Sequence, residues 1–593
     1  MWRDRWAWAS AAAVLPLILH SLGAPLGEPV ADDFDYLHRV LFTRNLSLVD
    51  GCGSVLWWRP LSRQLYFKLL APLMLANPAL IAALHVALLA FTAVLLYRAL
   101  RAGLGGPLAA LAASFPLLME STRMLVAWPS NFQDLGAMFF MALALHEAAA
   151  ARLASTLASI AAALLCKEVA APVALILPWL PAGAPRDHRR WNAAIAALVA
   201  AWGIVYAWIH ARAGLTWPHA PAGVPDASWP ARGAWALLNS GRAAMSLPPD
   251  RVRLDPFVIA AIIAGAFAVA ATAVAPAARA RLARAMPWAG FGLAWYAACI
   301  VGLAPTYPDW LASRGAFAAI GLGVALAAVT GAAHPALAAA LFTLRLALFA
   351  MSPGPPAGVS NLAVERGSLL DFPKLVRLQR MMRDTRRALH TQHPRLPANA
   401  EVGLYNLPWG AQYAFGGDQS LEAWYGDSTL RWISPSVFTL HPNTPLVSIV
   451  EFEMYANPCV VLLEPAAMRE VMMAIQIGNQ GDWVAGLERL ARADSLEPDT
   501  AARAFRGQVS GVRAVAFAYL GRLDEAEREA RRSTRFYPRH PYAHLALGTI
   551  AFRRGRLAEA DAEVDTILDA QPDYVPAFRL RAAIQKVESA QKP

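Results

Sequence analysis

Long apolar runs between residues 6 and 351 constrain the fold of this chain more than any other feature. Ala, Leu and Val dominate these runs, and charged residues mostly fall between them. About 20 consecutive apolar residues can cross a bilayer as a helix, which satisfies its backbone polar groups internally. Over 593 residues the chain is 57% hydrophobic and 16% charged, which is too apolar for a soluble protein of this length. The sequence therefore predicts a membrane part, followed after Met351 by a soluble part of ordinary charge density.

We expect about eleven membrane helices, several of which are too short to cross without neighbours. The first, over residues 6–22, is interpreted as a retained span, because no clear cleavage site of small residues follows it. The other candidates are residues 79–99, 105–119, 133–150, 153–166, 168–181, 193–210, 256–276, 287–304, 312–331 and 335–351.

Arginines in the short turns between spans predict a cytoplasmic N-terminus, because positive residues concentrate on the cytoplasmic side. These turns hold Arg98, Arg101, Arg152, Arg186, Arg189, Arg190, Arg279, Arg281 and Arg284. An odd number of spans then places the first loop and the soluble part on the outer side. The net charge of +11 suits anionic headgroups or phosphate-bearing substrates. Nucleic acid is not expected, since the sequence shows no basic cluster interleaved with aromatic residues.

Three carboxylates stand together just past the first apolar run, in Pro29-Val30-Ala31-Asp32-Asp33-Phe34-Asp35-Tyr36. Acids at the rim of a bilayer are costly unless they are solvated, paired or used in chemistry. A solvated turn and a functional site both remain open on this stretch alone. Apolar residues then recur at near-helical spacing, which predicts an amphipathic helix on the membrane surface with Arg39 and Arg44 exposed.

Further polar residues lie in four stretches beside the predicted spans. Three of them also have a purely structural interpretation: Arg59 could extend to lipid headgroups, Lys167 and Glu168 could form a neutral pair at a tight turn, and Glu120 and Asp134 could cap helices. The stretches are Trp57-Trp58-Arg59-Pro60-Leu61, residues 120–135, residues 164–172 and Ala312-Ser313-Arg314-Gly315-Ala316-Phe317.

Taken in this order, the acidic first loop and the four stretches resemble the membrane glycosyltransferases of the GT-C fold. The similarity is to the protein O-mannosyltransferase-like branch that carries tetratricopeptide repeats, and it covers residues 1–350 and the repeats. The last stretch departs from the family, because the Glu and the aromatic residue of its Ser-Glu-Arg-aromatic element are missing from their usual places around Arg314.

The resemblance implies that a sugar passes from a polyprenyl phosphate to an exported acceptor. Such a reaction needs a base for the acceptor hydroxyl and cations for the departing phosphate. By the resemblance Asp32 is the base, and Asp33 orients it or binds the acceptor. Converging carboxylates would also offer ligands to a divalent metal, but a sequence does not show convergence. The phosphate candidates are Arg59, Lys167 and Arg314, and the supporting polar residues are Glu120, Asp134 and Glu168.

Residues 352–470 predict a small α/β domain on the outer side. It contains an amphipathic helix over residues 369–389 and strands over residues 401–405 and 459–463. A disulfide between Cys52 and Cys459 is open, since both fall outside the predicted spans. No cysteine spacing resembles a zinc site.

Residues 471–593 contain a 34-residue repeat, the period of tetratricopeptide repeats. An irregular earlier unit passes through Gly481 and Pro498, and a last helix is expected from Val575 to Glu588. Such repeats form a helical solenoid whose concave surface can bind a protein partner. The residues that carry the period are Gly521 and Gly555, Ala526 and Ala560, and Pro538 and Pro572.

The sequence thus predicts a mainly α integral membrane glycosyltransferase with an outward carboxylate base, in a bacterial inner membrane with periplasmic C-terminal domains. An alternative is a non-enzymatic membrane anchor whose repeats assemble a cell-surface complex; its first-loop acids would then be replaceable. A transporter fits less well, because the predicted spans hold few polar residues to line a path. The sugar, the carrier lipid and the nature of the acceptor leave no mark in the sequence.

Overall fold

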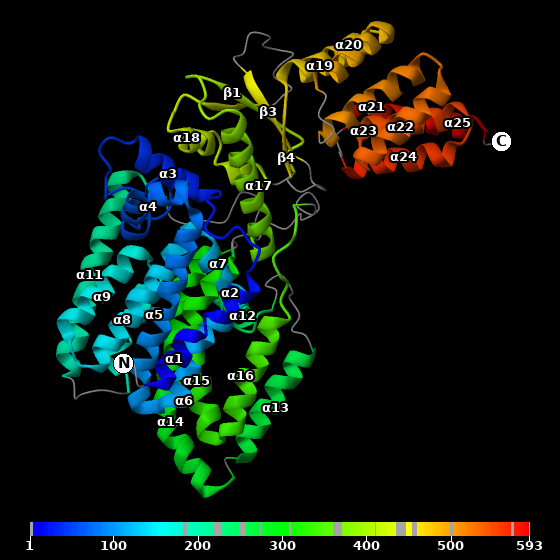
Figure 1. Cartoon of the computed structure of the whole chain (residues 1–593). Helices are drawn as coiled ribbons and strands as arrows, with labels where there is room; N and C mark the ends of the chain where they lie inside the picture. Colours follow the sequence, from blue (N-terminus) through cyan, green and yellow to red (C-terminus); the bar gives the residue numbers. More distant parts are fainter. Residues whose placement is uncertain are drawn as a thin grey trace. The chain divides into compact units, whose positions relative to one another are not determined.

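The structure, a computed structural model, falls into two compact units (Figure 1). The apolar unit comprises residues 1–357, 365–382 and 414–419, and the C-terminal unit comprises residues 358–364, 383–413 and 420–593. The division into domains at residues 351 and 470 stays a prediction. The structure describes residues 4–181, 187–216, 227–247, 256–272, 274–307, 310–359, 370–408, 411–433, 446–452, 459–497, 502–570 and 574–591.

Four helices among the described residues are long and apolar enough to cross a membrane. They are α5 (Pro78–Leu104), α11 (His188–Ala213), α14 (Pro276–Leu303) and α15 (Gly315–Ala333). A membrane protein with a mainly helical fold is therefore supported, while the count of eleven spans stays a prediction.

The other helices of the apolar unit are mostly shorter. α9 spans the residues predicted for it, and Figure 1 shows α5, α8, α9 and α11 side by side. The shorter helices are α1 (Arg5–Ala12), α2 (Leu15–His20), α3 (Asp32–Phe42), η1 (Leu61–Leu65), α4 (Tyr66–Ala76), α6 (Gly106–Ser114), η2 (Phe115–Leu118), α7 (Thr122–Ala127), η3 (Pro129–Asn131), α8 (Phe132–Ala149), α9 (Leu153–Cys166), α10 (Ala170–Ala174), η4 (Leu177–Trp179), α12 (Trp229–Ala244), α13 (Pro256–Thr272), η5 (Ala304–Thr306), η6 (Ala312–Arg314) and α16 (Pro335–Ala350).

One of two N-terminal predictions needs correction. The continuous span over residues 6–22 is broken into α1 and α2, because Pro16 has no N–H to continue the helical hydrogen bonds. The helix predicted after the acidic stretch is α3, and Arg39 and Arg44 are exposed as expected. Its apolar residues Phe34, Tyr36, Leu37 and Val40 are buried within the protein, whereas Leu41 is 40% exposed, and its location on the membrane surface stays a prediction.

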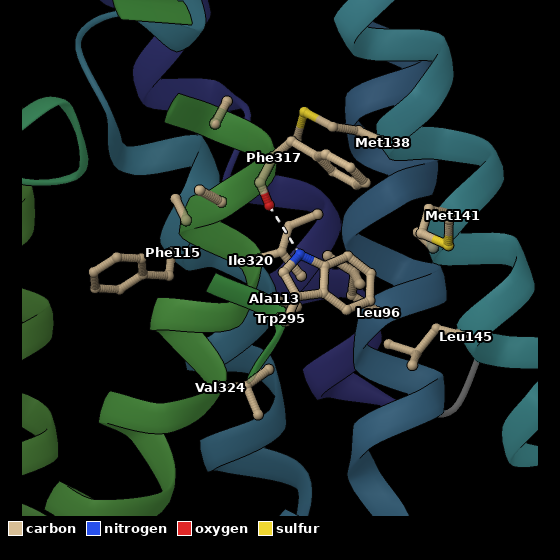
Figure 2. Close-up of a cluster of buried hydrophobic side chains, with 14 of the residues drawn as sticks. Leu96, Ala113, Phe115, Met138, Met141, Leu145, Trp295, Phe317, Ile320 and Val324 are labelled. Carbon is tan, nitrogen blue, oxygen red and sulfur yellow. Dashed lines mark hydrogen bonds between the residues drawn. The ribbon is translucent and has the colours of Figure 1, made fainter. Parts of the chain in front are cut away.

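The core of the apolar unit lies where α5, α6, α8, α14 and α15 meet. In Figure 2, side chains from these helices and η2 surround Trp295, whose indole N–H donates to the Phe317 carbonyl at 3.1 Å. Gly292 and Gly321 let α14 and α15 approach closely, because a Cβ on Gly292 would lie 2.5 Å from the Gly321 carbonyl oxygen. Small residues at such a crossing are typical of helices packed in membranes.

The C-terminal unit contains a four-stranded sheet in the order β2-β1-β3-β4. β1 (Glu401–Tyr405) pairs in parallel with β2 (Arg431–Ile433) and β3 (Leu446–Phe452), and β3 pairs antiparallel with β4 (Val460–Leu463). β1 matches its prediction, and β4 begins one residue after the predicted start. The predicted amphipathic helix is α17 (Phe372–Gln392), which begins in the apolar unit, and α18 spans Gln419–Tyr425.

Helices α19 to α25 follow the sheet, and each packs on the next. Gly521 and Gly555 adopt left-handed conformations in the turns after α21 and α23, with φ of 77° and 73°. Ala526 and Ala560 are fully buried. Pro498 and Pro572 lie outside the described residues. The helices are α19 (Pro465–Asn479), α20 (Trp483–Leu496), α21 (Arg503–Tyr519), α22 (Leu523–Phe536), α23 (Pro541–Arg553), α24 (Leu557–Ala570) and α25 (Val575–Gln591).

Candidate functional site

The two first-loop acids begin α3 but differ in environment. Asp32 is exposed, and it follows Ala31, whose backbone φ of 53° is unusual for a residue with a side chain. Asp33 is fully buried: it accepts hydrogen bonds from the Val30 N–H and the Ser130 N–H, both at 2.8 Å, and from the Ser130 hydroxyl. Burial raises the pKa of Asp33 to about 8, against the effect of the Ser130 donors. Asp33 therefore ties α3 to η3 and fixes the position of Asp32.

Arg59 is buried and paired rather than extended to solvent. Its Nε donates to Glu168 Oε2 at 2.8 Å, and its Nη1 donates to Gln133 Oε1. The guanidinium also lies 4.8 Å from the centre of the Trp57 ring. This geometry holds the planar cation in one orientation, with Glu168 as its counter-ion.

Lys167 lies between α9 and α10 and pairs with Asp134 of α8, with 2.6 Å between Nζ and Oδ1. Lys167 and Glu168 therefore bond to different partners instead of neutralising each other. Burial lowers the pKa of Lys167 to about 8; Asp134 opposes this shift, and the positive charges of Arg59 and Arg314 add to it. The positive charge of Arg314, at the end of η6, thus affects the pKa of Lys167.

Arg63 is a further member of this region that the sequence reasoning did not assign. It is only 3% exposed, and it donates to Gln133 Oε1 at 3.2 Å and to the carbonyl oxygens of Gly51 and Trp57. Within the described ranges no carboxylate lies within ion-pair distance of it. Burial lowers the pKa of Arg63, and Asp32 is among the negative groups that oppose the shift. Its position four residues after Arg59 was the available signal, since the Arg63 N–H donates to the Arg59 carbonyl across that spacing.

Glu120 lies in a different group, which we call the Glu120–Arg123 hub. Arg123 donates to Glu120 Oε1 at 2.7 Å and to the Pro353 carbonyl at 2.9 Å, and its guanidinium stacks 4.1 Å from the centre of the Phe372 ring. His20 Nε2 donates to the Ser352 carbonyl at 2.8 Å beside it. The hub therefore anchors the chain between α16 and α17, and the structure does not bring Glu120 to the other predicted site residues.

An open apolar hollow of about 400 Å³ lies elsewhere in the apolar unit. Its uncharged lining comes from the η4 region and from α14. It includes none of the predicted site residues, so the polar chemistry lies apart from it. The lining residues are Ile176, Trp179, Pro181, Pro287, Gly290, Phe291 and Ala294.

The sequence left open a divalent-metal site and a Cys52–Cys459 disulfide in the part of the chain that the structure describes. No group of three or more His, Cys, Asp or Glu side chains is placed there to hold a metal ion. All four cysteines are free thiols, so Cys52 and Cys459 do not form a disulfide in this structure. The Cys459 thiol instead donates to Asp384 Oδ2 at 3.5 Å.

Residues far apart in the sequence thus form one charged cluster, which consists of Asp32, Arg59, Arg63, Asp134, Lys167, Glu168 and Arg314. No protein-family model and no curated protein matches this chain. The cluster combines an exposed carboxylate, which can accept a proton, with a buried guanidinium that lacks a carboxylate partner. Together these groups can hold an anion and deprotonate a neighbouring hydroxyl.

Proposed function

We propose that this chain is an integral membrane glycosyltransferase that moves a sugar from a polyprenyl phosphate to a hydroxyl of an exported acceptor. The observation that supports this function is Arg63, a buried cation without a carboxylate partner in the described part of the chain, whose pKa is affected by the charge of the exposed Asp32. The described acceptors that Arg63 donates to, Gln133, Gly51 and Trp57, are neutral, so an added anion would give this buried charge a negative partner. A phosphate from a membrane lipid would supply that anion.

In the proposed reaction, Asp32 takes the proton of the acceptor hydroxyl. The acceptor oxygen forms a bond to the anomeric carbon, the bond from that carbon to the phosphate oxygen breaks, and the electron pair leaves with the phosphate. Arg63 stabilises the charge that develops on the phosphate, with Arg59, Lys167 and Arg314 around it. Glu168 and Asp134 hold Arg59 and Lys167 in place.

Asp33 is a positioning residue in this scheme. Among the described residues its carboxylate accepts hydrogen bonds from Val30 and Ser130, and Asp33 is 0% exposed. Its effect on catalysis passes through the orientation of Asp32 at the start of α3. The expectation that Asp33 binds the acceptor is therefore not part of the proposal.

The proposal also includes the finer architecture expected from the sequence: about eleven spans, an outward site, a bacterial inner membrane and periplasmic C-terminal domains. Helices α19 to α25 would form a tetratricopeptide-repeat solenoid that binds a protein acceptor or partner. The left-handed Gly521 and Gly555 and the buried Ala526 and Ala560 support the repeat, since they occupy matching turns and matching helix contacts.

The test is sugar transfer from a polyprenyl-phosphate sugar pool in membranes, at matched protein levels. Asp32→Asn should lower the rate by roughly 10² or more, the effect of losing a positioned base. Asp187→Asn is the control, because Asp187 is an exposed helix cap whose role asparagine can fill.

Unchanged transfer by Asp32→Asn would remove Asp32 from its role. A native protein that transfers no lipid-linked sugar, but whose truncation at residue 480 disrupts a cell-surface complex, would favour the non-enzymatic scaffold.

A further inference from the structure

Three buried hydrogen-bonding groups lie unpaired around the start of α15. The indole N–H of Trp310 and the hydroxyls of Ser313 and Ser240 find no hydrogen-bond partner in the part of the chain that the structure describes. These residues are 2%, 1% and 0% exposed, respectively. Buried polar groups are nearly always paired, and leaving one unpaired costs stability. Three in one region indicate that a ligand completes them.

The elements that carry these groups pack directly against each other. A Cβ on Gly315, the first residue of α15, would lie 3.1 Å from Ala243 Cβ and 3.7 Å from Ser240 Cα of α12. The Trp310 ring meets Trp235 of α12 edge-on, with 5.3 Å between ring centres. Ser240 of α12, Ser313 of η6 and Trp310, which lies just before η6, therefore belong to a single packing interface.

The same interface holds a helix N-terminus. η6 runs into α15, and together they form an apolar helix over Ala312–Ala333. The Arg314 N–H donates to the Leu311 carbonyl and the Gly315 N–H to the Ala312 carbonyl, so this end attracts an anion through the positive end of the helix dipole. Arg314 lies in this first turn, close enough to Lys167 for its charge to act there. The unpaired hydroxyls and indole N–H thus stand where an anion is favoured.

We propose that the start of α15 is a phosphate-binding subsite, in which Trp310 Nε1 and the hydroxyls of Ser240 and Ser313 donate to the phosphate oxygens. The Arg314 side chain and the positive end of the helix dipole supply positive charge. This subsite adds Trp310, Ser240 and Ser313, which the sequence did not point to, to the site of the proposed function. The identity of the lipid rests on that function. The ligand is a phosphate group, either carried by a lipid or free in solution.

The test is binding without transfer, read as the rise in melting temperature of the full-length protein in detergent, because a ligand of the folded state stabilises it by mass action. The probes are polyprenyl phosphate, inorganic phosphate and the neutral polyprenol. The variants are Ser240→Ala and Ser313→Ala. Ser114→Ala is the control, because Ser114 is buried but its hydroxyl already donates to the Ala110 carbonyl.

We expect polyprenyl phosphate to raise the melting temperature of the native protein and of the control, and the neutral polyprenol not to. Each of the two alanine variants should need about ten-fold more polyprenyl phosphate for the same rise, the loss of one hydrogen bond to a charged group. A response to inorganic phosphate would show that the phosphate alone is recognised. A response to the lipid only would show that its chain is required as well.

The proposal is overturned if neither phosphate stabilises the protein. It is also overturned if Ser240→Ala and Ser313→Ala melt at or above the native temperature and bind polyprenyl phosphate normally. The two hydroxyls would then be buried without a hydrogen-bond partner and would not bind phosphate. Failure of the transferase is a separate result: a native protein that binds phosphate through these residues but transfers no sugar keeps the subsite and loses the proposed function.

Discussion

The apolar unit holds two groups of buried charges that behave differently. In the Glu120–Arg123 hub the arginine has a carboxylate, a backbone carbonyl and an aromatic ring as partners, and it joins chain segments that must stay together. In the charged cluster, Arg59 and Lys167 are paired, but Arg63 has no carboxylate partner among the described residues and Asp32 faces solvent. Burial of a charge therefore does not by itself mark a functional site. We propose that the functional site is marked instead by a buried charge without a carboxylate counter-ion whose pKa is affected by an accessible acid, as for Arg63 and Asp32.

The largest effect on stability is expected in the hub. Arg123→Ala removes the partner of Glu120 and leaves a mostly buried carboxylate alone, which should cost roughly 3–5 kcal/mol of unfolding free energy. Denaturant unfolding in detergent measures this loss. The double variant Arg123→Leu with Glu120→Leu should recover most of it, because no unpaired charge remains. An Arg123→Ala protein as stable as the native one would remove the hub from its structural role.

Lys167→Met should cost about 3 kcal/mol, because it leaves Asp134 buried without its cation. Adding Asp134→Leu should restore the melting temperature. Sugar transfer should stay lost in the double variant, since the cation that faces the phosphate is still missing. Recovery of both stability and transfer would mean that this pair is as purely structural as the hub.

A smaller effect is expected from the titration of Asp33. Its pKa is raised by burial from 3.8 to about 8, so the folded state binds this proton more tightly than the unfolded state. The stability that the protonated carboxyl contributes is complete below pH 4 and is lost as the pH rises through 8. Melting temperatures measured from pH 4 to 8 should fall more for the native protein than for Asp33→Asn. Parallel curves for the two proteins would contradict the raised pKa.

The smallest effect on stability belongs to Asp32→Asn. Asp32 is exposed, and exposed substitutions usually change the unfolding free energy by less than about 0.5 kcal/mol. The melting temperature should therefore stay close to the native value even though transfer is lost. A large destabilisation would show that Asp32, like Glu120, serves the fold.

Much of the fold could be predicted where an apolar run has polar residues at both ends. α9 is such a case, since Arg152 precedes it and Lys167 follows it. The break between α1 and α2 was missed although Pro16 signalled it. Residues 120–135 were interpreted as a loop between spans, but they form α7, η3 and the start of α8 and are almost entirely buried. Their burial depends on neighbours from distant parts of the chain, which no local pattern reveals.

The sequence predicted which residues belong to the candidate site, but it did not predict which of them form ion pairs with each other. The sequence pointed to Arg59 and Lys167, yet their counter-ions Glu168 and Asp134 lie 109 and 33 positions away. Arg63 carried a local signal in its spacing from Arg59. The unpaired groups around α15 carried none, because Ser240 falls between the predicted spans 193–210 and 256–276, and its neighbours there follow from how α12 packs on α15.

The most direct test of the difference between the two groups compares Arg63→Gln with Arg123→Gln. Sugar transfer is measured per folded molecule, and the melting temperature is measured on the same samples. We expect Arg63→Gln to melt near the native temperature and to transfer at least about 10²-fold more slowly, as for loss of a transition-state charge partner. Arg123→Gln should melt well below the native protein, with normal transfer by the molecules that remain folded. Normal transfer by Arg63→Gln would contradict the assignment of the charged cluster as the site of sugar transfer.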